Sequence, residues 1–312
     1  MVEARQDLVQ DEANFEPIRS CTLCACEESR EKFREGIFRI VECCNCGLVY
    51  VTPRLRPELL PRVYDENYWS SDSPKEAGYA DYRSDAKLYL KTFERRYALI
   101  ERFTKGKGRA LDVGSAAGFF LKTLFDRGWH VDGVELSAEI VEHAKREYGF
   151  QDIHVGTIET SPFNKGSYDL LTMWDVVEHV PEPLPFLKES VSYLKEDGIL
   201  ILETQNVASK FAQRLGPKWQ HYKHLEHLYH FNPSTIERLL DQAGLEILEN
   251  TSKFGGKYVS ISFIRERATR LHPVMRYLLL PLAPFGKMSL YVNPRDEMVI
   301  VARKKKAKAG QR

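Results

Sequence analysis

The sequence predicts an α/β fold in which helices cover both faces of a largely parallel sheet, with a small zinc ribbon near the N-terminus. Three observations support this prediction. Residues 109–125 have the pattern of a buried strand, a turn of small residues and a helix. Strand and helix patterns then alternate along the chain, as they do where helices connect parallel strands. All six cysteines lie between Cys21 and Cys46.

Length and charge narrow the class of protein. The chain has 312 residues, enough for one large or two smaller domains, and a formal net charge of +1. A nearly neutral chain has no strong field for a nucleic-acid backbone, so nucleic acid is not an expected partner. The first residues are polar, and no uncharged run approaches the ~20 residues of a membrane span. We therefore expect a cytoplasmic protein without a transmembrane segment.

The cysteine spacing predicts a structural zinc site in a ribbon over residues 15–60. Cys21 and Cys24 form one Cys-x2-Cys pair, and Cys43 and Cys46 form a second one after eighteen intervening residues. Each short turn directs two thiolates at one ion, and two turns complete a tetrahedron. Four thiolates leave no open coordination position, so zinc would stabilise a segment too small for a core of its own. The alternative is a set of buried free thiols.

A connector and a long helix follow the ribbon. Residues 61–84 are expected to be a linker or flap, in which the aromatic stretch 64–69 is either a packed loop or a cover over the cofactor or substrate. Apolar side chains at helical spacing between 82 and 103 predict a long amphipathic helix. The glycines at 106 and 108 end this helix just before the first strand of the sheet.

The turn after the first predicted strand indicates a nucleoside site. A dinucleotide fingerprint needs glycine at the first, third and sixth positions of such a turn. This chain has Gly114, Ala116 and Phe119 there, and Phe119 argues against NAD. Backbone N–H groups in a turn of small residues can approach a ligand closely, and the helix start favours negative charge.

An acidic residue at the end of the second predicted strand strengthens this interpretation. Glu135 lies 23 residues after Asp112, close to the ~20 that nucleoside binding requires. A carboxylate at this place can accept hydrogen bonds from both ribose hydroxyls. Ligands of open α/β sheets bind beyond the carboxyl ends of the strands. Four residues are therefore expected around one crevice: Gly114, Glu135, Trp174 and Gln205.

Four stretches of the sequence resemble the motifs of one enzyme family. They are LDVGSAAGFFL (111–121), VDGVELS (131–137), YDLLTMWDVVEHVPEP (168–183) and DGILILETQN (197–206). Together they look like class I S-adenosylmethionine-dependent methyltransferases, related to the ubiquinone-biosynthesis O-methyltransferases and to bacterial sugar methyltransferases. The resemblance covers roughly residues 85–250. That family usually has Asp-x-Gly-x-Gly-x-Gly in the turn, and here Ala116 replaces the middle glycine.

The resemblance implies a fold, a cofactor and its contacts. A Rossmann-like seven-stranded methyltransferase sheet would occupy residues 85–303, with an acceptor-side segment at 216–292. S-adenosylmethionine would lie at the turn, against Asp112, Gly114, Ser115, Ala116, Gly118, Glu135, Leu136, Ile158 and Trp174. The cysteine module followed by CGLVYVTPR is similar to a subgroup found in bacterial glycan and secondary-metabolite pathways.

Histidines crowd the acceptor-side segment. His221, His224, His227 and His230 lie within ten residues, in neither order typical of metalloproteases. The stretch could be polar and aromatic packing, a second metal site or an acceptor site. HLEHLYHF resembles the Glu-His stretch of sugar C-methyltransferases, where this pair assists proton removal, and the matching residues are Glu226 and His227. Those enzymes normally carry a further C-terminal domain, which these 312 residues do not include.

Two sets of residues are candidates for the chemistry. We expect His227 to be the base, because a histidine titrates near neutral pH. Glu226 would orient it, and His224 or His230 would assist. Glu178 and His179, just after the fourth predicted strand, form the second set. The alternative for this pair is structural, an acid at a helix start and a histidine that shapes the loop.

The C-terminal third completes the sheet and adds two further features. Strands are expected to begin at 245 and 298. Between them, the apolar segment 271–286 contains three prolines and is too short to span a bilayer. It could be a lid over the acceptor, part of the core, or a contact with a membrane that carries a lipid-linked glycan. Residues 304–312 are expected to be a solvated basic tail, which could also meet anionic lipids.

The sequence as a whole predicts an S-adenosylmethionine-dependent methyltransferase that acts on a small-molecule or glycan acceptor. The acceptor could be a nucleotide-linked or lipid-linked sugar, in bacterial polysaccharide or secondary-metabolite biosynthesis. Two alternatives stay open: an RNA methyltransferase that grips its substrate with the ribbon, and a non-catalytic S-adenosylmethionine-binding protein. The sequence does not indicate whether oxygen, nitrogen or carbon receives the methyl group, nor the oligomeric state.

Overall fold

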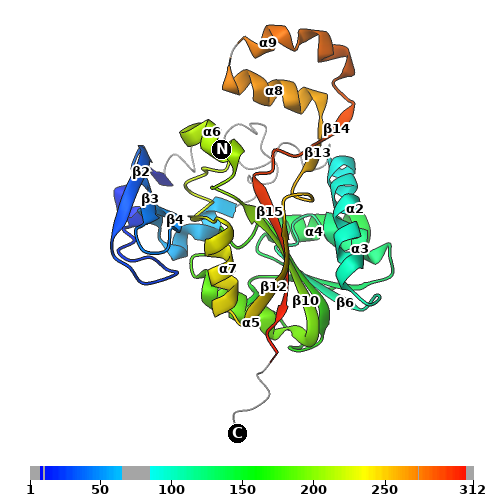
Figure 1. Cartoon of the computed structure of the whole chain (residues 1–312). Helices are drawn as coiled ribbons and strands as arrows, with labels where there is room; N and C mark the ends of the chain where they lie inside the picture. The colour runs from blue at the N-terminus through cyan, green and yellow to red at the C-terminus, as the bar shows by residue number, and fades with distance from the viewer. Residues whose placement is uncertain (1–7, 10, 65–84, 273, 307–312) are drawn as a thin grey trace.

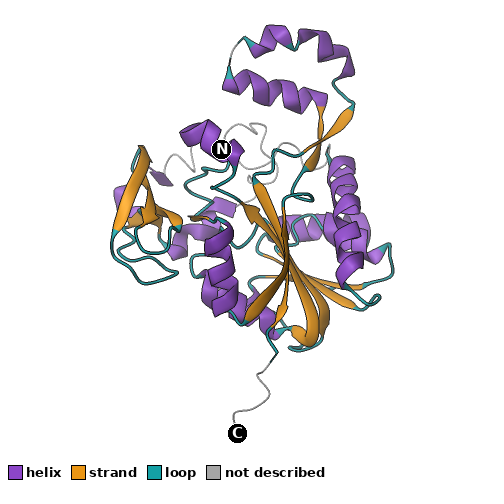
Figure 2. Ribbon diagram, viewed as in Figure 1, coloured by secondary structure: helices purple, strands orange, loops and turns teal. Residues whose placement is uncertain are grey.

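A computed structural model describes residues 8–9, 11–64, 85–272 and 274–306 (Figures 1 and 2). Its largest element is a seven-stranded sheet with the strand order β12-β15-β10-β9-β6-β7-β8. These strands are β6 (Arg109–Val113), β7 (His130–Glu135), β8 (Ile153–Val155), β9 (Tyr168–Trp174), β10 (Leu194–Gln205), β12 (Leu245–Thr251) and β15 (Glu297–Lys304). Five neighbouring strands are parallel, whereas β15 runs antiparallel to β10 and β12. The predicted α/β fold is confirmed.

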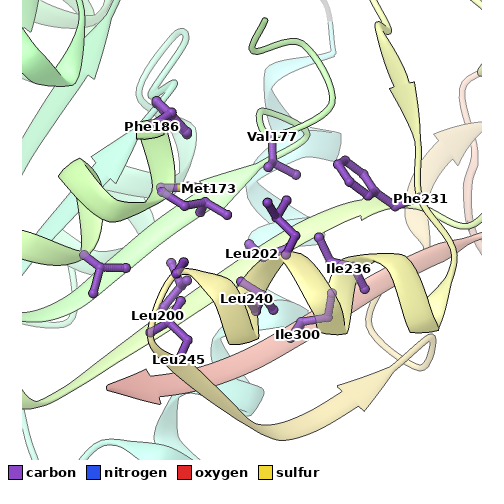
Figure 3. Packing of buried hydrophobic residues seen from close by; sticks show 14 of the residues in the cluster. Met173, Val177, Phe186, Leu200, Leu202, Phe231, Ile236, Leu240, Leu245 and Ile300 are labelled. Carbon is purple, nitrogen blue, oxygen red and sulfur yellow. The ribbon is translucent and has the colours of Figure 1, made fainter. Parts of the chain in front are cut away.

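Helices cover both faces of this sheet, because alternate residues of a strand point to opposite faces. Ile199 and Ile201 of β10 belong to the cluster beneath α2 and α3. Leu200 and Leu202 belong to the opposite cluster, where they pack with α5 and α7. Figure 3 shows this second cluster, which includes Ile236 of α7. The main helices are α2 (Ala86–Phe103), α3 (Phe119–Phe125), α4 (Ala138–Tyr148), α5 (Pro183–Ser192) and α7 (Pro233–Gln242). The shorter helical turns are η1 (Glu12–Asn14), η2 (Pro57–Tyr64), η4 (Ile158–Thr160), α6 (Lys210–Leu215) and η5 (Gly216–Lys218).

The cysteine module forms a small antiparallel sheet that a distant segment completes. The strand order is β11-β4-β3-β2. The strands are β2 (Ser29–Glu35), β3 (Phe38–Cys43), β4 (Val49–Thr52) and β11 (Tyr229–His230), and a separate pair joins β1 (Phe15–Glu16) to β5 (Arg54–Leu55). β11 comes from the histidine-rich segment, and Tyr229 pairs with Tyr50. The N-terminal module is therefore docked on the acceptor side of the larger domain.

A buried arginine fastens this module in place. Arg54 is 5% exposed, and its guanidinium donates to the carbonyls of Val51 (3.1 Å) and Leu228 (3.3 Å) and to Tyr229 Oη (2.7 Å). It also lies 4.1 Å from the centroid of the Tyr229 ring. Tyr229 Oη in turn donates to the carbonyl of Pro181 at 2.6 Å. One network thus joins the N-terminal module, the histidine-rich segment and the loop after β9.

We expect Arg54→Ala to loosen the N-terminal module, because it leaves buried acceptors without their charged donor. Such a loss costs about 2–4 kcal/mol of the free energy of unfolding. Limited proteolysis should release the module faster than in the wild type. Arg56→Ala is the matched control, since Arg56 is exposed and donates to the carbonyl of Ala13 at 2.9 Å. Equal proteolysis rates for the two variants would contradict the role given to Arg54.

Between β12 and β15 the chain leaves the sheet to form an arm, residues 257–292. At its base β13 (Lys257–Ser260) pairs antiparallel with β14 (Ser289–Val292). Its outer part consists of α8 (Ile261–Leu271), α9 (Met275–Leu278) and η6 (Leu280–Phe285). These helices stand clear of the rest of the molecule in Figure 1. The described side chains of 274–285 are mostly exposed, so this apolar segment is not part of the core. No helix in the described ranges is long and apolar enough to cross a membrane.

Two predicted features lie largely beyond the described residues. Residues 65–84 hold most of the expected flap and linker, and residues 307–312 hold the end of the basic tail. The first residues of that tail, Lys304 and Lys305, contact the rest of the domain. Lys304 ends β15 and donates to the carbonyl of Leu194 at 2.7 Å, and Lys305 pairs with Asp241.

Candidate active site

A cavity of about 680 Å³, here called the main cavity, opens at the carboxyl ends of β6, β7 and β9. Helix α2 and the arm also contribute to its wall, through Tyr89 and Lys257. A volume of this size suits a small ligand. Of the nine residues expected to contact a cofactor, eight line the main cavity: Asp112, Gly114, Ser115, Ala116, Glu135, Leu136, Ile158 and Trp174. Gly118 is outside the wall and precedes α3 with a left-handed φ of 75°.

The turn between β6 and α3 is tied to β7. The backbone N–H groups of Gly114 and Ser115 donate to the carbonyl of Val134 at 2.8 and 3.0 Å. These two N–H groups therefore have partners within the protein. Gly114 has a φ of 78°, and a Cβ there would lie 2.6 Å from Val176 Cγ2. Both the backbone conformation and the available space require glycine at this position.

Ala116 occupies the place of the missing middle glycine. Its φ is 46°, in the left-handed region that glycine adopts without strain. An alanine in this conformation costs roughly 1–2 kcal/mol. The Ala116 N–H donates to the carboxylate of Glu135.

The carboxylate of Glu135 lies in the wall of the main cavity and accepts a backbone hydrogen bond on each oxygen. Its Oε2 accepts the Ala116 N–H at 3.0 Å, and its Oε1 accepts the Ser137 N–H at 3.0 Å. Only 8% of the residue is exposed. Burial raises the pKa of Glu135, although the backbone hydrogen bonds oppose the shift. Each carboxylate oxygen has a second acceptor position, so the group can receive two more hydrogen bonds from a ligand.

Aromatic and apolar side chains form the neighbouring wall. Phe119 stacks on Tyr89 with ring centroids 5.2 Å apart and an interplanar angle of 6°. Leu136 and Ile158 add aliphatic surface. Trp174 Nε1 is buried without a hydrogen-bond partner among the described residues. This wall suits an uncharged ring system better than a phosphate.

The wall becomes charged beyond β9. Lys257 Nζ lies 3.1 Å from Asp175 Oδ2 and 3.0 Å from Glu297 Oε1. Arg96 pairs with the fully buried Glu203 at 2.5 Å. Burial would raise the pKa of Asp175, but Lys257 and Arg96 outweigh it and lower that pKa to about 2. The sequence analysis missed these residues, because isolated charged residues on separate helices and strands form no motif.

The two candidate histidines meet at this charged end. His179 lines the main cavity, and its ring centroid lies 4.6 Å from that of His227 at an angle of 80°. Burial lowers the pKa of His179 to about 4, so its ring is neutral at neutral pH. His227 is 5% exposed and lies behind His179, outside the cavity wall. The structure thus brings together two residues that are 48 positions apart and sets His179 nearer the ligand space.

The other members of the histidine-rich stretch have different surroundings. Glu226 accepts from Lys223 Nζ at 3.3 Å. His224 Nε2 lies 2.9 Å from Glu35 Oε2 of the N-terminal module. His230 is fully buried. Of the histidines expected to assist His227, His224 thus faces the N-terminal module and His230 lies in the core.

Glu178, His179 and His227 lie close enough to share a cation, since their ligand atoms are within 4.8 Å of one another. The hydrogen bonds of Gln205 bear on this possibility. Its Nε2 donates to the carbonyl of Tyr229 at 3.0 Å and faces His227 Nδ1 at 3.3 Å. Where Gln205 donates to Nδ1, that nitrogen is occupied, and Nε2 is the atom that His227 would offer to a cation.

Comparison with known proteins shows the family. A family model described as a methyltransferase domain matches residues 82–250, which is more than half of the 312 residues. The chain belongs to this family.

Individual relatives agree with this assignment. The methyltransferase is 32% identical over 168 residues to a ubiquinone biosynthesis O-methyltransferase of Marinobacter nauticus, a match that covers 48% of this chain and 69% of the relative. A namesake from Xanthomonas axonopodis pv. citri is 28% identical over 196 residues, with 58% and 76% covered. One solved chain, from the complex of the Haloferax volcanii Trm112 methyltransferase activator with a methyltransferase, has a TM-score of 0.52 at 16% identity, with 73% and 98% covered. That structural likeness shows the fold alone. The chain is a class I S-adenosylmethionine-dependent methyltransferase.

Asp112 of the methyltransferase generates a prediction on pH. Burial raises its pKa from 3.8 to about 7, although the Thr172 hydroxyl donates to it at 2.6 Å and opposes the shift. A raised pKa in the folded state means that stability present at low pH is lost as the pH rises towards 7. We expect Asp112→Asn to gain stability over the wild type between about pH 4 and pH 7, by on the order of 1 kcal/mol per pH unit, and then to level off. Urea unfolding across this range measures the difference, and parallel curves for the two proteins would refute it.

The four paired cysteines converge in the N-terminal module. Their Sγ atoms lie within 4.8 Å of one another, with 3.6 Å between Cys21 and Cys46 and 3.5 Å between Cys24 and Cys43. A tetrahedral zinc ion with Zn–S bonds of ~2.3 Å needs separations of about 3.8 Å. None of these four cysteines forms a disulfide. The donor set and its geometry fit a structural zinc ion.

The two turns that carry these cysteines have the same form. The Ala25 N–H donates to the carbonyl of Cys21 at 2.7 Å, and the Gly47 N–H donates to the carbonyl of Cys43 at 3.0 Å. Ala25 and Gly47 both have positive φ values, 58° and 74°. Each turn therefore closes over five residues and ends in a left-handed residue, and the two thiols of each pair lie in the four-cysteine cluster.

If zinc binds there, the purified methyltransferase should contain about one equivalent of the metal by elemental analysis. Cys43→Ser should lose it, because three thiolates cannot complete the tetrahedron. The adjacent Cys44 is exposed, so Cys44→Ser is the matched control and should keep the metal. Wild-type protein without metal after growth in zinc-supplemented medium would rule out the site.

Proposed function

We propose that the methyltransferase acts on a small-molecule or glycan acceptor that binds at the His179 end of the main cavity. The supporting observation is that the wall of the main cavity changes from apolar to charged along its length. Near Glu135 the wall offers acceptors and apolar surface for a nucleoside, whereas near His179 and Lys257 it is charged. The relatives are named as ubiquinone biosynthesis O-methyltransferases, which supports a small acceptor. The resemblance of the cysteine module to glycan-pathway proteins supports a sugar.

The residues near the turn fit S-adenosylmethionine. Glu135 would accept the two ribose hydroxyls with the free acceptor positions of its carboxylate. Leu136 and Ile158 would flank the adenine. Trp174 Nε1 and Ser115 Oγ are buried polar atoms without a partner in the described structure, and a bound ligand would satisfy such groups.

Methyl transfer from S-adenosylmethionine requires little chemistry from the side chains of the protein. S-adenosylmethionine supplies an electrophilic methyl carbon, so the protein needs to hold a nucleophile in line and accept a proton. We assign the proton to His179, which is neutral and lies in the cavity wall. Burial disfavours its charged form, whereas the negative charge of Glu226 favours it. His227, the base expected from the sequence, would support His179 from behind.

This assignment predicts a separation of turnover from cofactor binding. His179→Gln should lower kcat by about 10²-fold or more, because general-base catalysis contributes at least that much. Its Kd for S-adenosylmethionine, measured by calorimetry, should change little. His130→Gln is the matched control, since His130 is exposed at the start of β7. An unchanged kcat in His179→Gln would show that another group takes the proton.

The acceptor itself can be identified without guessing its structure. Extract from the source cells is incubated with the enzyme and methyl-labelled S-adenosylmethionine, and its small-molecule, glycan and RNA fractions are analysed by mass spectrometry. We expect label in the small-molecule or glycan fraction. Label in RNA would instead establish the RNA methyltransferase alternative, which the net charge of +1 does not favour. Cofactor binding without any labelled product would establish the non-catalytic alternative.

A further inference from the structure

The arm exposes a concentrated apolar surface. Of the thirteen large apolar side chains that are strongly exposed in the described residues, nine lie between 274 and 292. Tyr277 is 74% exposed, Leu278 65% and Phe285 51%. We call the exposed apolar residues of 274–288 the apolar tip. Contiguous apolar surface on one projecting element marks a contact site rather than ordinary solvent-facing surface.

The arm is also basic. Residues 261–292 contain five Lys or Arg and one Glu, which gives a net charge of +4. Because the whole chain has a net charge of +1, the rest of it carries −3. Arg276 and Lys287 are both exposed within the apolar tip. Apolar side chains interspersed with exposed cations are the composition of segments that lie in the interface of an anionic bilayer.

We propose that the methyltransferase docks on an anionic phospholipid membrane through the apolar tip. Tyr277, Leu278 and Phe285 enter the headgroup region, while Arg276 and Lys287 meet lipid phosphates. An anionic bilayer would accommodate both the exposed apolar side chains and the positive charge of the arm. A second copy of this chain does not, since a two-fold contact through the tip would place two basic arms against each other.

The base of the arm connects this surface to the main cavity. Lys257, the first residue of β13, lies in the cavity wall. The Tyr258 N–H donates to Thr92 Oγ1 of α2 at 2.9 Å, and Lys91 Nζ lies 4.5 Å from the centroid of the Tyr258 ring. Docking would therefore hold the cavity close to the bilayer. An acceptor with a lipid tail could then reach the cavity without leaving the membrane. This consequence rests on the proposed function. The docking proposal itself does not.

Vesicle co-sedimentation tests the proposal with the full chain, in the absence of cofactor and acceptor. Vesicles of phosphatidylcholine alone are compared with vesicles that also contain phosphatidylglycerol. We expect binding to the anionic vesicles, weakened by salt, and little binding to the neutral ones. Arg276→Gln and Lys287→Gln should each lower the affinity about fivefold. Leu278→Ser/Phe285→Ser should remove binding.

The matched control removes apolar surface elsewhere. Phe125 and Leu248 are 55% and 36% exposed and lie outside the arm, so Phe125→Ser/Leu248→Ser should bind as the wild type does. Thermal unfolding checks that each variant is folded. Absence of binding to anionic vesicles would overturn the proposal, as would a dimer in ultracentrifugation that only Leu278→Ser/Phe285→Ser dissociates. Neither result would bear on methyl transfer, so the membrane-docking proposal can be overturned while the proposed function still holds.

Discussion

The buried carboxylate of Glu135 holds together two loops in the wall of the main cavity, those that follow β6 and β7. One oxygen is bound to the turn after β6 through Ala116, and the other to the start of α4 through Ser137. Opening the turn would break the hydrogen bond from Ala116 to this buried carboxylate. The first two amides of the turn are also bound to Val134 of β7. The loop that distinguishes this family is therefore positioned by β7 and by one acid, so that a ligand meets a preformed surface.

A second set of contacts positions the loop that carries His179. The backbone carbonyl of Glu178 accepts the N–H groups of Leu228 and Tyr229 at 2.9 and 3.3 Å, which fixes the loop after β9 against the histidine-rich segment. Tyr229 is in turn part of the sheet of the N-terminal module and a partner of Arg54. The first cysteine turn lies against the same residue, since Thr22 Oγ1 is 2.8 Å from Tyr229 Oη. The position of His179 beside His227 thus depends on contacts with the N-terminal module, which lies far away in sequence.

Local patterns were sufficient to predict much of this architecture. The small-residue turn, the acid 23 positions later and the paired cysteines are each defined by short-range spacing, and the structure places them as expected. The ionic network of Lys257, Asp175 and Glu297 could not be predicted, because its members come from the arm, from the loop after β9 and from β15. The pairing of β11 with β4 was also missed, since a two-residue strand has no detectable period. His179 and His227 are 48 positions apart in the sequence, so only the structure shows that they are neighbours and that His179 is the one in the cavity wall.

The central claim is that Glu135 holds the sugar of a nucleoside cofactor in the main cavity. A crystal structure of the protein with S-adenosylhomocysteine measures this directly. The result predicted is a ribose whose two hydroxyls donate to the carboxylate oxygens of Glu135, with the adenine against Leu136 and Ile158. A ligand bound elsewhere on the protein, with the Glu135 carboxylate in contact only with Ala116 and Ser137, would contradict it.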